Sequence, residues 1–372
     1  MSAEVILRAT DVVKHFPVQS ARLRRSADFV HAVDGVTLEV RRGETVGLVG
    51  ETGCGKSTLA RCLTRLHDLT SGTIEFEGQD ISRLPPRRLK GVRREMQMIF
   101  QDPYGSLNPK RRVGAIIGDP FAIHKVASGL ERRRRVQEMM ELVGLNPEHY
   151  NRFPAEFSGG QRQRIGVARA LALKPKLLIC DEPVSALDVS IQAQVLNLLT
   201  DLQKQLDLTY VFISHDLSVV RHVSDRLMLM YLGKVVESGP SEDIYQRPRH
   251  PYAAALLSAV PLPDPALARQ RQKIVLAGDV PTPISPPAAC RFHPRCPKAQ
   301  PRCAEEEPLL EARLGDPGSH VTACHFPVAD GESLVAARPT LSEDQRVIEP
   351  EAVAEAVVAE LGRGARHGSP KP

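Results

Sequence analysis

One eight-residue stretch constrains the fold more than any other part of the chain: residues 50–57, with the sequence Gly-Glu-Thr-Gly-Cys-Gly-Lys-Ser. It fills every fixed position of the pattern G-x-x-x-x-G-K-[S/T], which is typical of a phosphate-binding loop. The apolar run at 45–49 suits a buried strand, and residues 57–66 predict a helix with leucines on one face. A strand, this loop and a helix in that order predict an α/β fold that binds a triphosphate.

The residue types in the loop explain how it would hold phosphate. Glycines let successive backbone N–H groups point inward, and the following helix contributes the positive end of its dipole. We expect Lys56 to reach the β- and γ-phosphates and the Ser57 hydroxyl to ligate Mg²⁺. The predicted nucleotide-binding residues here are Gly50, Glu51, Thr52, Gly53, Cys54, Gly55, Lys56, Ser57 and Thr58.

Length and composition indicate a soluble protein of more than one domain. At 372 residues, two domains plus a tail are expected, and 42% hydrophobic with 25% charged residues is ordinary for a globular chain. No run approaches the ~18 consecutive apolar residues of a membrane span, and the N-terminus lacks a secretory signal. We therefore expect a cytoplasmic protein whose membrane role comes only through a partner.

The charge pattern does not favour nucleic acid. The formal net charge is 49 − 44 = +5, with arginine clusters at residues 22–25, 87–94 and 132–135. No aromatic residues interleave with these clusters to stack bases, and there is no Trp. Solvated surfaces are the expected interpretation.

Further predicted strands deliver polar side chains at their ends. Residues 96–100 precede Gln101, residues 176–180 precede Asp181 and Glu182, and residues 209–214 precede His215. In open α/β sheets the ligand lies outside the carboxyl ends of the strands, so these side chains are expected beside the phosphates. Asp181 would hold Mg²⁺ through water, Glu182 would polarise the attacking water, and His215 would donate to the γ-phosphate. Both carboxylates can face the nucleotide only if the strand ends there.

A second anion site is predicted about a hundred residues after the loop. Residues 112–150 have helical periodicity, and Phe157-Ser158-Gly159-Gly160-Gln161 then leads into a helix predicted over 162–173. The serine hydroxyl, the free N–H groups and the helix dipole suit a phosphate.

Together these motifs resemble the ATP-binding subunits of ABC transporters. Residues 50–57 resemble the Walker A loop, Gln101 the Q-loop, 157–161 the signature with Phe157 in place of the usual Leu, and 177–182 the Walker B strand. Residues 185–188 resemble the D-loop, His215 the switch histidine, and Phe16 the aromatic that stacks on adenine. The resemblance implies a RecA-like P-loop core with an antiparallel β-subdomain and a helical subdomain at about 101–160, within a domain spanning residues 1–245.

The subfamily resembled is that of the dipeptide/oligopeptide and nickel importers. Residues 97–109 and 249–261 carry this likeness, and Cys54 with Tyr104-Gly105 is similar to the second, F-type ATPase of such systems. The resemblance implies a head-to-tail heterodimer with a paralogous ATPase, in which Ser158, Gly159, Gly160 and Gln161 complete the partner's ATP site. It further implies two membrane permeases, an extracytoplasmic solute-binding protein, and a peripheral position on the cytoplasmic face of the membrane.

Residues 246–330 are predicted to form a small Pro/Cys-rich C-terminal domain. Cys290, Cys296, Cys303 and Cys324 cluster there with the spacing C-x₅-C-x₆-C-x₂₀-C. Iron–sulfur, zinc and free thiols are all open; the loose spacing lacks the C-x₂-C knuckles of zinc sites, so a 4Fe-4S cluster fits better. His293 and His325 are alternative ligands. Residues 331–372 are predicted to be a largely disordered tail, with one helix at 351–361.

The expected function is ATP hydrolysis that drives peptide import. Nickel, glutathione or oligosaccharides are the alternative solutes, because specificity resides in other subunits. A soluble ABC ATPase acting on nucleic acid or ribosomes is disfavoured, since such chains usually carry two cassettes or a coiled-coil or zinc insertion. A scaffold with a dead site is disfavoured because every hydrolytic position is filled.

Overall fold

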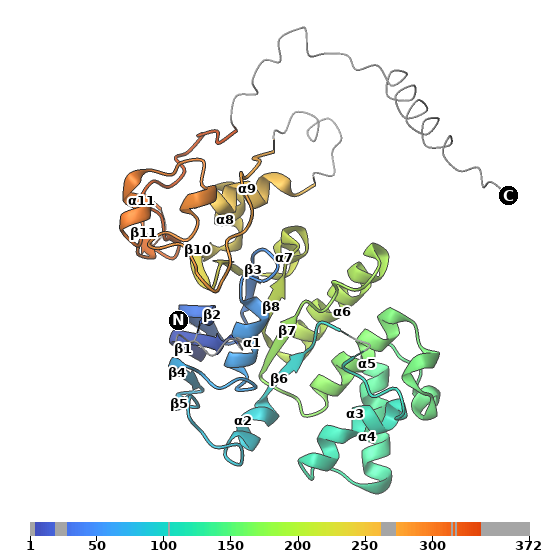
Figure 1. The fold of residues 1–372 in the computed structure, drawn as a ribbon. Helices are drawn as coiled ribbons and strands as arrows, with labels where there is room; N and C mark the ends of the chain where they lie inside the picture. Colours follow the sequence, from blue (N-terminus) through green and yellow to red (C-terminus); the bar gives the residue numbers. More distant parts are fainter. Residues whose placement is uncertain are drawn as a thin grey trace, which may run out of the picture. The chain divides into compact units, whose positions relative to one another are not determined.

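The computed structural model describes residues 4–18, 28–102, 105–261, 273–313, 315–316 and 318–335 (Figure 1). The described residues up to Leu334 belong to one compact unit. The predicted helix at 351–361, nearly all of the predicted tail, the arginine cluster at 22–25 and Tyr104 lie outside the described residues.

The larger sheet has the strand order β11-β12-β10-β9-β3-β8-β7-β6. Its five strands from β9 to β6 run parallel, so their carboxyl ends share one edge. These strands are β9 (Arg226–Tyr231), β3 (Thr45–Val49), β8 (Thr209–Ser214), β7 (Leu177–Asp181) and β6 (Met96–Ile99). The strands predicted at 45–49 and 209–214 are confirmed at both ends.

A second sheet is antiparallel, in the order β2-β1-β4-β5. It consists of β2 (Phe29–Arg41), β1 (Val5–Pro17), β4 (Ser71–Phe76) and β5 (Gln79–Asp80). This sheet agrees with the antiparallel β-subdomain that the resemblance implied, and β4 has a partner on either side in it. Its buried side chains, such as Leu7 and Ile74, pack in one core with Leu59 after the loop.

The helices of the described residues are α1 (Lys56–Leu63), α2 (Leu89–Glu95), α3 (Val113–Ile123), α4 (Gly129–Leu142), α5 (Gly159–Leu171), α6 (Val189–Leu206), α7 (Leu217–Val223), α8 (Ser241–Gln246), α9 (Pro251–Ala259) and α11 (Pro301–Glu305). Among them, α1 and α5 begin and end within about three residues of the helices predicted at 57–66 and 162–173. The helical pattern predicted at 112–150 corresponds to α3 and α4, whose Val136 and Met140 are fully buried. No helix in the described part of the chain is long and apolar enough to cross a membrane.

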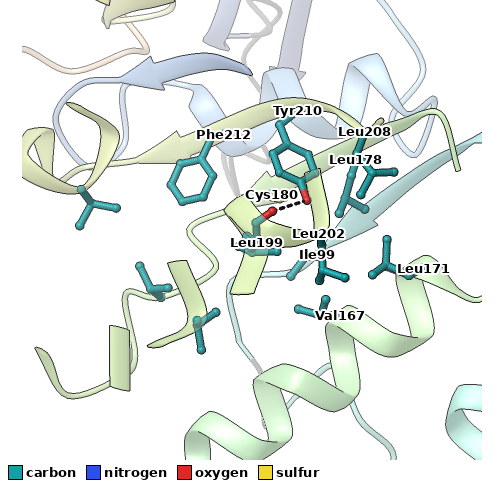
Figure 2. Close-up of a cluster of buried hydrophobic side chains, with 14 of the residues drawn as sticks. Ile99, Val167, Leu171, Leu178, Cys180, Leu199, Leu202, Leu208, Tyr210 and Phe212 are labelled. Carbon is teal, nitrogen blue, oxygen red and sulfur yellow. Dashed lines mark hydrogen bonds between the residues drawn. The ribbon is translucent and has the colours of Figure 1, made fainter. Parts of the chain in front are cut away.

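The core beneath the parallel strands is shown in Figure 2. Side chains of β7 and β8 pack against α5 and α6, and burying each large one stabilises the fold by about 1.5–3 kcal/mol. The Tyr210 hydroxyl donates to the Leu199 carbonyl at 2.9 Å, which gives its buried polar atom a partner. The labelled core residues are Ile99, Val167, Leu171, Leu178, Cys180, Leu199, Leu202, Leu208, Tyr210 and Phe212. This packing fixes the strand ends that carry Gln101, Asp181 and His215.

The residues after 245 extend the larger sheet and share its core. β10 (Lys234–Pro240) pairs with β9 on one side and with β12 (Val321–Thr322) on the other, and β11 (Glu311–Ala312) follows at the edge. The rings of Tyr231, Tyr252 and Phe292 are buried together, with centroids 5.0–5.4 Å apart. The C-terminal segment is therefore packed onto the nucleotide-binding part through aromatic contacts.

A buried carboxylate strengthens this attachment. Glu237 on β10 accepts hydrogen bonds from the backbone N–H groups of Arg249 at 2.8 Å and His250 at 2.7 Å. The His320 ring lies 2.7 Å from the same carboxylate. Because a buried charge is tolerated only when it is well hydrogen-bonded, these contacts fix the segment entering α9.

Candidate functional site

The loop between β3 and α1 is shaped by glycines whose conformations other residues rarely adopt. Gly50 has φ 155°, Gly53 has φ 82° and Gly55 has φ 108°. A Cβ atom on Gly50 would lie 2.2 Å from the Met230 carbonyl oxygen, and one on Gly55 would lie 2.0 Å from the Ala32 carbonyl oxygen. The loop is thus pressed against neighbouring backbone, and only glycine fits at both positions.

Lys56, the first residue of α1, is a buried cation at the centre of this loop. Its side chain is almost fully covered, with 4% relative exposure. The Nζ atom donates to the carbonyl oxygens of Gly50 at 2.7 Å and Glu51 at 3.0 Å. Neutral carbonyls do not neutralise the ammonium charge, so an anion such as a phosphate is its natural partner.

Ser57 and Asp181 meet across the sheet edge, as predicted. The Ser57 hydroxyl donates to the Asp181 carboxylate at 2.7 Å, although 124 positions separate the two residues. Burial raises the pKa of Asp181 above its usual value, against the opposing effect of the Ser57 hydrogen bond. A hydroxyl and a carboxylate are the hard oxygen ligands that Mg²⁺ prefers, so this donor pair fits the expected metal.

Glu182 follows the end of β7 and turns toward two other predicted residues. Its φ of 46° lies in the left-handed region, which breaks the strand's alternation and directs the side chain to the same edge as Asp181. Its carboxylate accepts a hydrogen bond from the Gln101 amide at 2.7 Å, and the His215 ring lies 3.3 Å from it. The expectation that the strand ends so that both carboxylates share one edge is confirmed.

These residues border a cavity large enough for a phosphate and a water molecule. Its volume is about 470 Å³, and it is lined by Thr52, Gln101, Asp102, Glu182, Ser185, Ala186 and His215. A buried carboxylate, an amide and an imidazole converging on one cavity can orient and deprotonate a water molecule.

The signature residues form a helix start that lies elsewhere. The Ser158 hydroxyl accepts a hydrogen bond from the Gln161 N–H at 3.3 Å, and the Gln161 side chain accepts one from the Ser158 N–H at 3.0 Å. This capping box explains why α5 begins at Gly159 rather than at the predicted residue 162. Both side chains are exposed, and Figure 1 shows α5 with α3 and α4, apart from α1. The chain's own cavity is not lined by the signature.

Phe16 lies near the end of β1 with part of its ring exposed. The Lys14 ammonium lies 4.8 Å from the ring centroid, and the His67 ring meets it edge-on at 5.5 Å. A flat, partly exposed aromatic ring is the type of surface on which a nucleotide base stacks.

Two contacts to the loop were not predicted from the sequence. The Tyr252 hydroxyl accepts a hydrogen bond from the Glu51 N–H at 2.8 Å, and Arg295 pairs with the Glu51 carboxylate at 2.8 Å. The sequence marked Tyr252 only as part of the 249–261 stretch that resembles the subfamily, with no predicted contact to the loop. No local pattern marks such contacts, because 201 and 244 positions separate these residues from Glu51.

Comparison with known proteins shows the family. Residues 33–185 match the family described as ABC transporter, and residues 236–303 match the C-terminal region of oligopeptide/dipeptide transporters. The oligopeptide transport ATP-binding protein AppF of Bacillus subtilis (strain 168) is 53% identical over 324 residues, which span 87% of this chain and 98% of that protein. The chain belongs to the oligopeptide/dipeptide ABC transporter family, as an ATP-binding subunit.

Other relatives agree with this assignment. The oligopeptide transport ATP-binding protein OppF of Escherichia coli (strain K12) is 50% identical over 311 residues, 83% of this chain and 93% of that protein. A solved dimeric ATP-binding cassette in a post-hydrolysis state, bound to ADP and Pi, is 27% identical with a TM-score of 0.56. It covers 63% of this chain and 98% of its own. The P-loop ABC fold and the ATPase activity follow from these likenesses.

The prediction of an iron–sulfur cluster in this ABC ATPase is contradicted. Among the described residues, the group of three ligating atoms within 4.8 Å of one another is His15, His31 and Asp34, which includes no cysteine. The four predicted ligands, Cys290, Cys296, Cys303 and Cys324, are free thiols. Because no cysteine belongs to such a group among the described residues, a zinc site at these cysteines is not supported either.

Burial explains why Cys296 and Cys324 stay protonated. It raises the pKa of Cys296 to about 11 and that of Cys324 to about 12, which keeps both thiols protonated near neutral pH. The two histidines named as alternative ligands are turned to backbone carbonyls instead: His293 lies 2.8 Å from the Cys290 oxygen, and His325 lies 2.9 Å from the Glu306 oxygen. The cysteines act here as small packing residues.

Proposed function

We propose that this chain hydrolyses ATP to energise the import of dipeptides or oligopeptides through an ABC permease in the cytoplasmic membrane. The observation that carries the proposal is the Glu182 carboxylate, held by Gln101 at 2.7 Å and 3.3 Å from His215 at the cavity beside the phosphate loop. The relatives are named as peptide transport ATP-binding proteins, which supports peptides as the solute.

In this proposal the chain's own residues divide the work on its own ATP. Lys56 and the N–H groups of the loop, apart from the Glu51 N–H that Tyr252 accepts, bind the phosphates, and Phe16 stacks on the base. Ser57, Asp181 and Gln101 would hold Mg²⁺, which when bound would supply positive charge that offsets the negative charge of the phosphates. Glu182 accepts the proton of the attacking water, and His215 donates a hydrogen bond to the γ-phosphate.

The signature of this chain would serve ATP that is bound to a partner. Ser158, Gly159, Gly160 and Gln161 are grouped at an exposed helix start that does not line the chain's own cavity. The solved relative is a dimer, which supports a dimeric ATPase, and we propose that its two subunits are arranged head to tail. We propose a paralogous ATPase as the partner. ATP would close this dimer and hydrolysis would reopen it, so that the permease alternates between two states.

A groove between the sheet and the helical segment is the proposed contact for the permease. A cavity of about 640 Å³ lies there, bordered on one side by Phe100, Gln101 and Arg169 and on the other by Asp119, Pro120 and Ile123. Ile123 is 63% exposed, which is unusual for a large apolar side chain at a cavity. Because Gln101 also contacts Glu182, movement in this groove would reach the hydrolytic carboxylate directly.

The proposed organisation is an ATPase domain at residues 1–245, with the helical subdomain at about 101–160, and a Pro/Cys-rich extension at 246–330. Residues 331–372 form the tail, to which we assign no function. The match of residues 236–303 to the C-terminal region of peptide transporters supports the extension. The chain would lie peripherally at the membrane, fed through its permeases by an extracytoplasmic binding protein, with no role for nucleic acid.

The test is the substitution Glu182→Gln in the full-length chain. The amide keeps the shape of the side chain but cannot accept the water's proton, so ATP turnover should fall by about 10²–10⁴-fold. ATP affinity should stay within about threefold of the wild type, because the phosphate contacts are untouched. Glu75→Gln, at a half-buried position on β4 where the carboxylate pairs with Arg8, is the matched control and should leave turnover unchanged. Unchanged turnover in Glu182→Gln would contradict the assignment of Glu182 as the residue that accepts the proton of the attacking water.

A further inference from the structure

The phosphate loop is held from outside by two residues of the C-terminal segment. Tyr252 on α9 accepts the backbone N–H of Glu51 at 2.8 Å. Arg295, in the short 3₁₀ helix His293–Arg295, donates to both oxygens of the Glu51 carboxylate, at 2.8 and 3.2 Å. One loop residue is therefore fixed at its backbone and at its side chain by residues that lie beyond position 245.

Arg295 is itself held rigidly. Its side chain is only 9% exposed, and its guanidinium lies 5.9 Å from the ring centroid of Tyr231, whose hydroxyl is 3.4 Å from one of its nitrogens. Tyr231 in turn packs against Phe292, with ring centroids 5.2 Å apart, and Phe292 lies three residues before Arg295 in the chain. A bidentate hydrogen bond from an immobilised guanidinium to a carboxylate is a strong and directional interaction.

The charge of Glu51 explains why such a contact matters. The phosphate loop must receive a triphosphate, and an unpaired carboxylate inside the loop would repel it. The Glu51 carbonyl already lies 3.0 Å from the Lys56 ammonium, so a released Glu51 side chain has that cation within reach. Pairing with Arg295 keeps this carboxylate neutralised and turned away from Lys56.

A second connection between the loop and the C-terminal segment runs through the turn between β9 and β10. The Gly233 N–H donates to the Cys54 carbonyl at 2.8 Å, and Arg291 donates to the Leu232 carbonyl and to Asp34. Arg291 is 8% exposed, so its charge is also satisfied by built contacts. The turn between β9 and β10 thus joins the loop to the C-terminal segment at a second point.

We infer that Arg295 is a positioning residue for nucleotide binding, and that the C-terminal extension is a structural part of the chain's own ATP site. The inference rests on the proposed ATPase function and deepens it. Arg295 acts through Glu51: it preorganises the phosphate loop and leaves Lys56 free for the nucleoside triphosphate. Tyr252 supports the same loop through the backbone.

The test compares Arg295→Ala with Arg302→Ala, measuring the Kd for ATP on the purified full-length chain and KM and kcat on its complex with the paralogous ATPase. Arg302 is exposed in the same extension and pairs with Glu306, so it serves as the matched control. In Arg295→Ala the KM and Kd for ATP should rise about ten- to a hundredfold while kcat changes by less than about threefold, because a charged pair is lost without touching the reacting atoms. Arg302→Ala should match the wild type.

A double mutant separates this positioning role from general loss of structure. In Glu51→Gln the repelling charge is absent, so adding Arg295→Ala should raise KM much less than it does alone. Equal effects in both backgrounds, or an unchanged KM in Arg295→Ala, would overturn the inference. If Arg295→Ala does not fold, Arg295→Gln replaces it, and an unchanged KM there is equally decisive. If the complex of the wild-type chain with its paralogous ATPase has no ATPase activity, the proposed function is refuted instead.

Discussion

Substituting Gly55 tests the physical account of the phosphate loop most severely. At φ 108° an alanine would be strained, which costs about 1–3 kcal/mol. Its Cβ atom would also lie 2.0 Å from the carbonyl oxygen of Ala32, which belongs to β2 and cannot rotate away like a side chain. Relieving such a contact costs about another 1–3 kcal/mol. We therefore expect Gly55→Ala to lower the free energy of unfolding by about 2–6 kcal/mol and to abolish tight ATP binding.

Gly53→Ala is the control, because Gly53 has φ 82° but no atom within 4 Å of a built Cβ. It should show backbone strain alone, about 1–2 kcal/mol. Urea unfolding of both full-length variants, followed by fluorescence and by circular dichroism, gives the comparison, and nucleotide titration gives the affinity. If Gly55→Ala is no less stable than Gly53→Ala, the loop is not pressed against β2 as described.

Two further predictions concern the signature and the sheet. Ser158→Ala removes the cap of α5 and should lower the free energy of unfolding by about 1 kcal/mol. ATP hydrolysis by the assembled dimer should fall, while ATP binding to the chain's own site persists. Loss of that binding would contradict the proposal that this signature serves the partner's ATP. Burial opposes ionisation of Glu77, but hydrogen bonds from Lys176 and Arg42 hold its pKa at about 2. Because this pKa is depressed, the stabilisation is present above about pH 4.5 and is lost as the pH falls toward 2. Glu77→Gln should therefore be less stable than wild type at pH 7 and nearly equal to it at pH 2, as measured by urea unfolding.

The nucleotide site was largely predictable because its signals are local. A loop motif between a strand and a helix determines where Lys56 and Ser57 lie, and hydrophobic runs that end in polar residues place Gln101, Asp181 and His215 at one edge. Parallel pairing of β3, β8, β7 and β6 then brings these ends together. Periodicity and strand-end chemistry were sufficient here.

The C-terminal segment was less predictable because its contacts are long-range. Its cysteine spacing suggested a cluster, yet spacing alone does not say where backbone turns direct the thiols, and burial raises the pKa of Cys296 and Cys324 so that both stay protonated. The pairing of Arg295 with Glu51 spans 244 positions and has no periodic or motif signal. The antiparallel sheet was expected only from the family resemblance, since strand pairing is not written in the pattern of a single strand such as β4.

The most direct test of the central claim is ATP-driven uptake of a labelled peptide into vesicles. The vesicles would contain this chain with its paralogous ATPase and permeases, and they would be supplied with the peptide-binding protein. Our account predicts peptide accumulation that requires ATP and that is reduced at least about tenfold by Glu182→Gln, in proportion to the loss of hydrolysis. Equal accumulation with the wild-type and Glu182→Gln chains, or ATP hydrolysis that never responds to peptide, would contradict it.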